Sequence, residues 1–494
     1  MSPPQPLASG AEGAAALRPL LATVLDALHE GAVLRGGPLP EGGPRAVAAR
    51  LRAAVGVPLP RHGAGADAAL RAIVRAVAEG AADPADPLCA AHLHCPPLAV
   101  AVAADLAASV LNPSLDSWDQ APAASELEAL VARALAAEIY PGRGPDHDQA
   151  PHPAPATPAG ASGTSSGTPD ALVTTGGTEA NQLALLLARE QYGSVQLVCG
   201  ENAHHSLHRA AWLLGLPPPV TVPAPTGVID PVALADVLRS HRGPDGAPAP
   251  ASGTARPVLV AATAGTTDAG LIDPLPRIAA LCAAAGARLH VDAAYGGALL
   301  FSDRLRPLLA GLDRADTVTL DLHKLGWQPV AAGLLAVREA GDLRVLGHRA
   351  EYLNADDDTA AGLPDLLGRS LRTTRRPDVL KIAVTARALG RSGLGALTEA
   401  VCAQAHAFAA LVAEHPGFDL HAAPVISTVL FRPAGADDRH VAAVRRRLLE
   451  EGRAVVGRAR VDGRLWLKAT LLNPHTRTDD LTALLKLVEG HTPR

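Results

Sequence analysis

The middle of the chain alternates short apolar runs with longer segments of helical periodicity. Apolar residues recur at helical spacing in 178–192 and 275–285. The runs short enough to be strands are 171–174, 196–199, 258–262, 288–291 and 317–320. Short apolar strands separated by helices are typical of a mainly parallel sheet. The pattern therefore predicts a large α/β domain.

The pattern before this region is helical. Residues 18–77 indicate helices broken by Pro/Gly turns, and 100–111 is a small-residue apolar helix. Residues 125–139 form a stronger helical pattern, in which Ser125 and Glu128 have the spacing of a capping box.

The pattern after about residue 378 is long helices with strands at 427–431 and 464–471. Three regions are therefore expected: an N-terminal helical segment over 1–110, a large domain over 111–377 and a small α+β domain over 378–494. Two stretches rich in Pro, Ala, Gly, Ser and Thr, at about 143–169 and 243–257, are predicted surface insertions of the large domain.

Composition and charge exclude several classes of protein. Aromatic residues make up only 2% of the chain, so its cores must use Ala, Val and Leu. The net charge is −5 without a basic stripe, which argues against nucleic-acid and membrane partners. The N-terminus lacks signal-peptide features, no transmembrane helix is expected, and the five cysteines are scattered without a CxxC pair. We expect a cytoplasmic protein.

A candidate reactive lysine follows the predicted strand at 317–320. Lys324 lies beside His323 and shortly before Gly326. A lysine taken out of water has a nucleophilic amine, as a Schiff-base site requires. Taken alone, a lysine after a strand is more often a solvated surface residue.

Two further segments follow predicted strands, where parallel sheets bind ligands. Asp292, in the segment LHVDAAYGG, is suited either to capping a turn or to pairing with a protonated pyridine nitrogen. Gly176 and Gly177, in TTGGTEAN, let the backbone approach an anion at the start of a helix. A simple strand–helix turn is the alternative for TTGGTEAN, which has neither the GxGxxG nor the Walker pattern of a nucleotide-binding loop.

Three histidines invite a metal interpretation. His204 and His208 are one helical turn apart, with His205 between them. No HExxH motif or third ligand is nearby, so we predict no metal site. A flat imidazole at His204 is suited to stacking on a flat cofactor ring.

Taken in this order, the segments resemble the group II pyridoxal-5′-phosphate-dependent amino-acid decarboxylases. The resemblance runs from about 91 to 480 and rests on TTGGTEAN, AHHS, AGTT, HVDAAYGG and DLHK. It implies the PLP-dependent transferase fold (fold type I), pyridoxal 5′-phosphate as cofactor, and a carboxy-lyase that converts an L-amino acid to an amine and CO2.

The resemblance also assigns roles by position. Lys324 would hold the cofactor covalently, Asp292 would pair with the pyridine nitrogen, and His204 would stack on the ring as a catalytic residue. The remaining cofactor contacts would come from Gly177, Thr178, Thr267, Ala294, Thr317 and His323.

Residues 348–358 resemble the mobile catalytic loop of the family. Tyr352 then matches the tyrosine that returns a proton to Cα after CO2 leaves, although a buried or stacked tyrosine is the alternative. The block 370–376 offers Arg375 and Arg376, either of which is suited to pairing with a carboxylate or with a partner subunit.

The expected substrate is a diamino acid, either 2,4-diaminobutyrate or lysine, because 203–473 is most similar to the bacterial diamino-acid decarboxylases. His94 and Leu322 depart from the family pattern, and His94 with Trp327 leaves an aromatic or acidic amino acid as an alternative. Further alternatives are another fold-type-I activity, such as aminotransfer, and a non-catalytic regulator; Tyr352 favours decarboxylation. The family implies a homodimer with its active site at the subunit interface.

Overall fold

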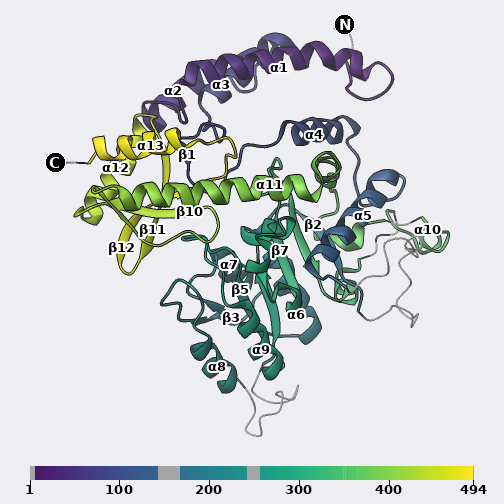
Figure 1. The fold of residues 1–494 in the computed structure, drawn as a ribbon. Coiled ribbons are helices and arrows are strands. Elements are labelled where there is room, and N and C mark those ends of the chain that lie inside the picture. Colours follow the sequence, from purple (N-terminus) through teal and green to yellow (C-terminus); the bar gives the residue numbers. More distant parts are fainter. Residues whose placement is uncertain are drawn as a thin grey trace. The chain divides into compact units, whose positions relative to one another are not determined.

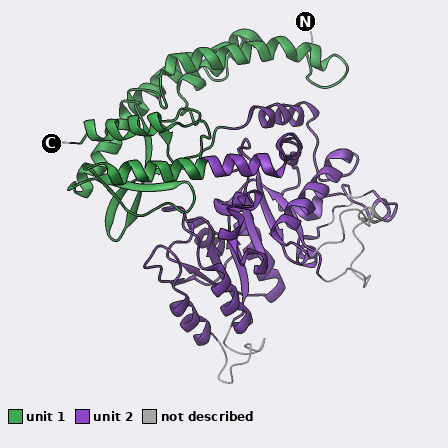
Figure 2. Cartoon of the chain, in the orientation of Figure 1, with its two compact units in different colours: residues 1–96, 401–494 green, residues 97–400 purple. Residues whose placement is uncertain are grey.

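The computed structural model of the chain describes residues 6–142, 167–241, 256–348, 350, 352–363 and 365–492. These residues form two compact units, one of residues 1–96 with 401–494 and one of residues 97–400 (Figure 2). The boundaries differ from those expected at 110/111 and 377/378, because the two ends of the chain share one unit. The predicted insertions lie outside the described residues except for their last few positions.

The unit of residues 97–400 is built on a seven-stranded sheet (Figure 1). In spatial order its strands are β2 (Asp170–Thr174), β8 (Gly333–Val337), β7 (Thr317–Asp321), β6 (Arg288–Asp292), β5 (Val258–Thr263), β3 (Gln196–Gly200) and β4 (Val220–Val222). The run from β7 to β4 is parallel, whereas β8 is antiparallel to both of its neighbours. The five predicted strands and the mainly parallel sheet are confirmed, and β4 and β8 are additional strands.

Helices connect these strands, as parallel pairing requires. The connecting helices are α6 (Gly177–Tyr192), α7 (His205–Leu213), α8 (Pro231–Ser240) and α9 (Leu275–Ala285), whereas α4 (Ala99–Leu111) and α5 (Pro122–Ile139) precede β2 and α10 (Asp356–Ala360) follows β8. Helix α6 is the central one, because it packs against β2 and β8 through Leu183 and against α7 and β3 through Leu185. Its position therefore depends on apolar contacts on more than one side.

The other unit joins the two ends of the chain. Its helices are α1 (Gly13–Arg35), α2 (Gly43–Val55), α3 (Ala66–Glu79), α12 (Asp438–Glu450) and α13 (Thr478–Gly490). Its sheet has the order β1 (Cys89–Ala90), β11 (Val455–Val461), β12 (Arg464–Thr470), β10 (Thr428–Pro433) and β9 (Phe418–Leu420). The short strand β1 pairs in parallel with β11, so the N-terminal segment completes the sheet of the C-terminal segment.

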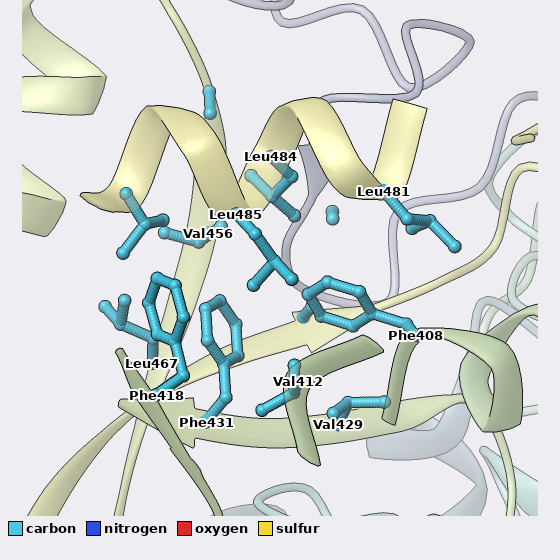
Figure 3. Close-up of a cluster of buried hydrophobic side chains, with 14 of the residues drawn as sticks. Phe408, Val412, Phe418, Val429, Phe431, Val456, Leu467, Leu481, Leu484 and Leu485 are labelled. Atoms are coloured by element: carbon cyan, nitrogen blue, oxygen red, sulfur yellow. The ribbon is translucent and has the colours of Figure 1, made fainter. Parts of the chain in front are cut away.

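The core of this unit holds three of the four phenylalanines of the chain. Phe408, Phe418 and Phe431 lie together below Leu484 and Leu485 of α13 (Figure 3). The rings of Phe408 and Phe431 meet edge to face with centroids 5.2 Å apart, an arrangement that aromatic pairs favour. Other members of the cluster are Ala, Val and Leu, as the composition requires.

The long helix α11 (Val379–Glu414) contributes to both units. Among the described residues it is the one helix long and apolar enough to cross a membrane by length and composition, although none was expected. Its backbone leaves helical geometry at Gly390, with φ 66° and ψ 176°. Phe408 and Val412 pack into the core of Figure 3, and Lys381 is buried in ion pairs. Packing of Phe408 and Val412 in that core accounts for apolar residues in the C-terminal part of the helix.

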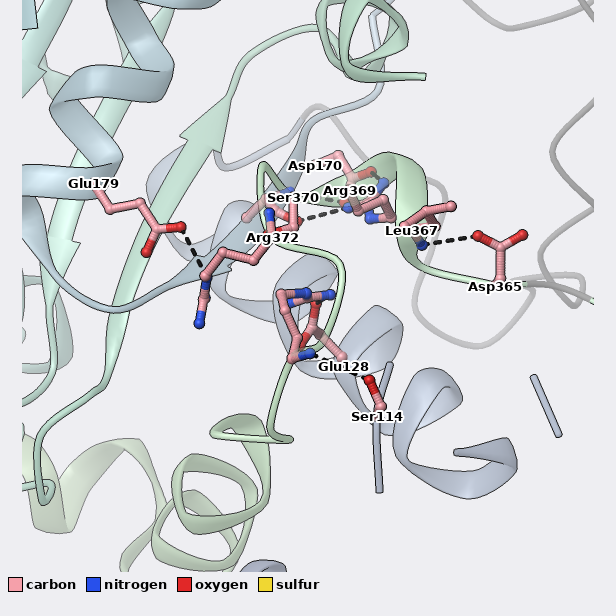
Figure 4. A network of polar contacts seen from close by, with 11 residues as sticks. Ser114, Glu128, Asp170, Glu179, Asp365, Leu367, Arg369, Ser370 and Arg372 are labelled. Carbon is pink, nitrogen blue, oxygen red and sulfur yellow. Dashed lines mark hydrogen bonds and ion pairs between the residues drawn. The ribbon is translucent and has the colours of Figure 1, made fainter. Parts of the chain in front are cut away.

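Helix α5 does not begin where the capping-box pattern predicted. It starts at Pro122, so Ser125 and Glu128 lie inside the helix and are buried. Glu128 accepts two hydrogen bonds from Arg375, at 3.0 and 2.7 Å, and both side chains are 2% exposed. The predicted cap is therefore wrong, and Glu128 instead holds the segment after residue 370, where Arg372 also pairs with Glu179 (Figure 4).

We expect Glu128→Ala to lower the free energy of unfolding by about 3–5 kcal/mol, because it leaves the Arg375 charge buried without its partner. The midpoint of urea-induced unfolding measures this change. Asp236→Ala is the control, because the Arg239–Asp236 pair is 66% and 62% exposed and its removal should cost about 0–1 kcal/mol. Equal losses in the two variants would contradict the prediction.

Candidate functional site

The predicted lysine and aspartate segments meet at one edge of the seven-stranded sheet. Strand β6 ends at Asp292 and β7 ends at Asp321, and these parallel neighbours place Asp292 opposite Thr319. Lys324 lies in the turn after β7. Because parallel strands end on the same side of a sheet, both side chains lie at the edge where such folds bind ligands.

A glycine turn closes this edge from the side of α6. A Cβ atom on Gly177 would lie 3.0 Å from Ala294 Cβ and 3.1 Å from Asp321 Oδ2, and one on Gly176 would lie 2.9 Å from His323 Cε1. No side chain caps the helix that starts there. Its first N–H groups are therefore suited to binding an anion. The structure thus brings Gly177, Ala294 and His323 together, with Thr178 next in the helix.

Lys324 is held by a carboxylate to which the sequence interpretation gave no role. Its Nζ lies 2.8 Å from Asp321 Oδ2, and His323 Nε2 lies 3.6 Å from the same oxygen. The Asp321 side chain is 3% exposed, and its Oδ1 accepts no hydrogen bond from the described residues. Burial lowers the pKa of His323, mainly by desolvation, which favours its neutral form.

Asp292 and His204 are connected through two residues that the sequence interpretation also missed. Asp292 Oδ2 accepts a hydrogen bond from Asn181 Nδ2 at 2.8 Å, and Oδ1 accepts one from the Ala294 N–H at 3.1 Å. Asn181 Nδ2 also donates to Ser206 Oγ at 2.9 Å, which lies 2.8 Å from His204 Nδ1. Desolvation by burial lowers the pKa of His204.

Thr317 begins β7, four residues before Asp321. Its hydroxyl lies 2.9 Å from His290 Nδ1. The structure therefore places the Thr317 hydroxyl in a buried hydrogen bond, and its predicted phosphate contact stays a prediction. Thr267 lies in an exposed turn after β5, and its cofactor role stays a prediction.

The catalytic-loop tyrosine and the two arginines are not assembled with Lys324. Tyr352 is 82% exposed, and within the described part of the chain no hydrogen bond joins it to the residues above. Arg375 is occupied by Glu128, and Arg376 pairs with Asp105 at 2.7 Å. Both arginines therefore serve contacts inside the chain.

The histidine cluster has a structural explanation. His204 caps α7, its Nδ1 accepting from the Ser206 N–H at 3.3 Å. His208 Nε2 lies 3.7 Å from Cys199 Sγ. Across the described ranges, no group of three or more His, Cys, Asp or Glu residues is placed to hold a metal ion.

Comparison with protein families gives a match over most of the chain. The model described as the pyridoxal-dependent decarboxylase conserved domain matches residues 51–434. This range includes Gly177, Asp292 and Lys324 at the sheet edge and extends to Tyr352.

Comparison with individual proteins agrees. The chain is 40% identical over 450 residues to the L-2,4-diaminobutyrate decarboxylase of Rhizobium meliloti (strain 1021), covering 88% of this chain and 84% of that protein. It is 29% identical over 477 residues to the enzyme of the same name from Acinetobacter baumannii, covering 90% and 87%. The solved glutamate decarboxylase domain of diaminobutyrate-pyruvate transaminase and L-2,4-diaminobutyrate decarboxylase from Vibrio parahaemolyticus superposes with a TM-score of 0.81 at 29% identity, over 98% and 97% of the chains.

Proposed function

The chain belongs to the pyridoxal-dependent decarboxylase family, and from this premise we propose that it removes the α-carboxyl group of an L-diamino acid as CO2. L-2,4-diaminobutyrate is the first candidate and L-lysine the second. The observation that carries the proposal is the position of Lys324 and Asp292 at one sheet edge, beside an uncapped glycine turn. The names of the two relatives support the choice of substrate.

The residues at this edge fit pyridoxal phosphate. The Gly176–Gly177 turn is a cradle that a Cβ would fill, and the uncapped N–H groups of α6 suit a phosphate. Lys324 supplies the amine that would hold the cofactor, and Asp292 supplies a carboxylate for a cationic ring nitrogen. When bound, the cofactor supplies a ring that takes up the electron pair left by the broken Cα–carboxylate bond.

The chain contributes electrostatics and orientation. Asp292 is 5% exposed, and its carboxylate is fixed by the Asn181 amide and the Ala294 N–H. It would therefore stabilise a positive charge on the ring nitrogen of the cofactor without any movement of the carboxylate. Asp321 compensates the charge of Lys324 while the amine is protonated. His204 is proposed to lie against the ring face, which would hold the Cα–carboxylate bond perpendicular to the ring.

The proposed reaction needs a proton donor, and the candidate for it, Tyr352, is exposed in the single chain. We propose that the protein is a homodimer, that the site lies at the subunit interface, and that Tyr352 reaches a site there to return a proton to Cα. A mass near twice the chain mass of 50.4 kDa in light scattering would support the dimer. A cytoplasmic location stays a prediction.

We expect the purified protein with pyridoxal phosphate to release CO2 fastest from L-2,4-diaminobutyrate and to form 1,3-diaminopropane. The panel should include L-lysine, L-aspartate, L-glutamate and L-tyrosine, with CO2 and amine both measured, because aminotransfer consumes the amino acid without CO2. A higher kcat/KM for an acidic or aromatic amino acid would replace the proposed substrate. Absence of CO2 from every candidate would contradict the proposed reaction.

A further inference from the structure

A chain of buried hydrogen bonds joins β6, β7, α6 and α7 behind Asp292. Its members are His290 (0% exposed), Thr317 (3%), Thr319 (0%), Asn181 (1%), Ser206 (0%) and Asp292 (5%). Groups so deeply buried must satisfy their hydrogen bonds with one another, which limits where each proton can be.

The amide of Asn181 has a single orientation that satisfies its neighbours. Asp292 Oδ2, at 2.8 Å, can only accept, so the amide nitrogen must face it. The same nitrogen donates to Ser206 Oγ. The amide oxygen therefore faces Thr319 Oγ1 and His290 Nε2, each at 2.9 Å. All four hydrogen-bonding positions of the amide are used.

This orientation fixes the proton of His290. Because the Asn181 oxygen can only accept, Nε2 of His290 must donate to it. Burial lowers the pKa of His290 to about 4, so the ring is neutral near pH 7 and its Nδ1 is bare. Nδ1 can then accept the hydroxyl proton of Thr317 at 2.9 Å.

At the other end of this series of hydrogen bonds, Ser206 fixes the position of the proton on His204. Ser206 Oγ receives the amide proton of Asn181, so its own proton is available to His204 Nδ1 at 2.8 Å. The Ser206 backbone N–H also donates to Nδ1, at 3.3 Å, and a backbone donor cannot reverse. With two donors directed at Nδ1, the single proton of a neutral His204 ring belongs on Nε2.

We propose that Asn181 is a positioning residue that, through Ser206, holds His204 neutral with its proton on Nε2 and holds Asp292 as an acceptor. The only N–H of the His204 ring is then the one directed away from Ser206. A carboxylate at position 181 could not do this, because it would offer no donor to Asp292 and would repel it. This proposal rests on the proposed function in one respect, which is that the group bound beside His204 and Asp292 is pyridoxal phosphate. The hydrogen bonds themselves do not depend on it.

The test begins without cofactor, on the full chain labelled with 15N-histidine. We expect the His204 and His290 signals, assigned by their loss in His204→Gln and His290→Gln, to show protonated Nε2 and bare Nδ1. The His290 ring should stay so from about pH 8 to pH 6, because burial lowers its pKa to about 4, and His204 should gain its second proton at a lower pH than exposed histidines do. The charged groups that face His204 are Asp292, Asp321 and Lys324, with the ring of His205 adjacent.

Two variants separate positioning from folding. Ser206→Ala removes the 2.8 Å hydroxyl donor and leaves only the longer backbone N–H, at 3.3 Å, directed at His204 Nδ1. The minor tautomer of His204 should therefore become detectable while His290 stays unchanged, and Asn181→Leu should alter both rings. Thr398→Val is the matched control, because this buried hydroxyl donates to the Leu394 carbonyl of its own helix and to no other group among the described residues. It should leave both rings unchanged. Should Asn181→Leu fail to fold, Ser206→Ala carries the test.

In the loaded enzyme, Ser206→Ala should lower kcat about tenfold with KM within about twofold, the size expected for loss of one buried hydrogen bond at a reacting group. A proton on Nδ1 of wild-type His204 would overturn the proposal. So would a Ser206→Ala protein with an unchanged tautomer and unchanged kcat. If the protein shows the expected tautomers but releases no CO2, the hydrogen-bond arrangement is supported and the proposed function is contradicted.

Discussion

Lys324→Ala is expected to reduce decarboxylation by about four orders of magnitude or more and to abolish covalent attachment of pyridoxal phosphate. The loss should be this large because the amine that holds the cofactor has no substitute at the sheet edge. Asp321 would keep its place but lose its cation, 2.8 Å away in the wild type. The measurements are CO2 release and the visible absorption of the bound cofactor.

The composition of the chain makes the attachment site easy to identify. There are only four lysines, Lys324, Lys381, Lys468 and Lys486. Lys381 is 0% exposed and pairs with Asp105 and Asp378, and Lys468 is 9% exposed. Borohydride reduction followed by peptide mass spectrometry should therefore place the cofactor on Lys324 alone.

Lys486→Ala is the control for this experiment, because Lys486 is an exposed residue of α13 in the other compact unit. It should leave both the cofactor and the rate unchanged. Cofactor found on Lys381 or Lys468 after reduction, or substantial CO2 release by Lys324→Ala, would show that the lysine has been assigned incorrectly.

The parts of the fold that were predictable are those set by local sequence. Apolar runs of four or five residues between helical segments identified five strands of the large sheet, and the glycines of TTGGTEAN identified the turn into α6. Family motifs then linked Lys324 and Asp292, which the parallel pairing of β6 with β7 brings to one edge.

The hydrogen-bond chain depends on contacts that are distant in sequence. Asn181 and Asp292 are 111 residues apart, and their contact depends on the packing of α6 on the sheet. A local signal was nevertheless present. In β7, Thr317, Thr319 and Asp321 alternate with apolar residues, and such alternation places polar groups on one face of a strand.

One further error has the same physical origin. The spacing of Ser125 and Glu128 fits a capping box, but burial against Arg375 decides the role of Glu128. The two-residue strand β1 is too short to produce any periodicity, so the joining of the chain ends could not be predicted.

Tyr352→Phe is expected to keep the cofactor bound and to lower the rate of amine formation by roughly 10²–10⁴-fold, the usual contribution of a general acid. Tyr352 is 82% exposed, so losing its hydroxyl should leave folding unaffected. The proton returns to Cα only after the carboxyl group has left. In a single turnover the variant should therefore still release CO2, with the amine appearing much later.

The control for this variant is Tyr192→Phe, which removes a hydroxyl from a tyrosine that is 40% exposed at the end of α6 and should leave the rate within about twofold of the wild type. Retention of the wild-type rate by Tyr352→Phe would assign the proton to another group. Equal slowing of CO2 and amine would place Tyr352 before bond cleavage, as a residue that orients the substrate. Only delayed amine formation after prompt CO2 release identifies Tyr352 as the acid, because no earlier step requires its proton.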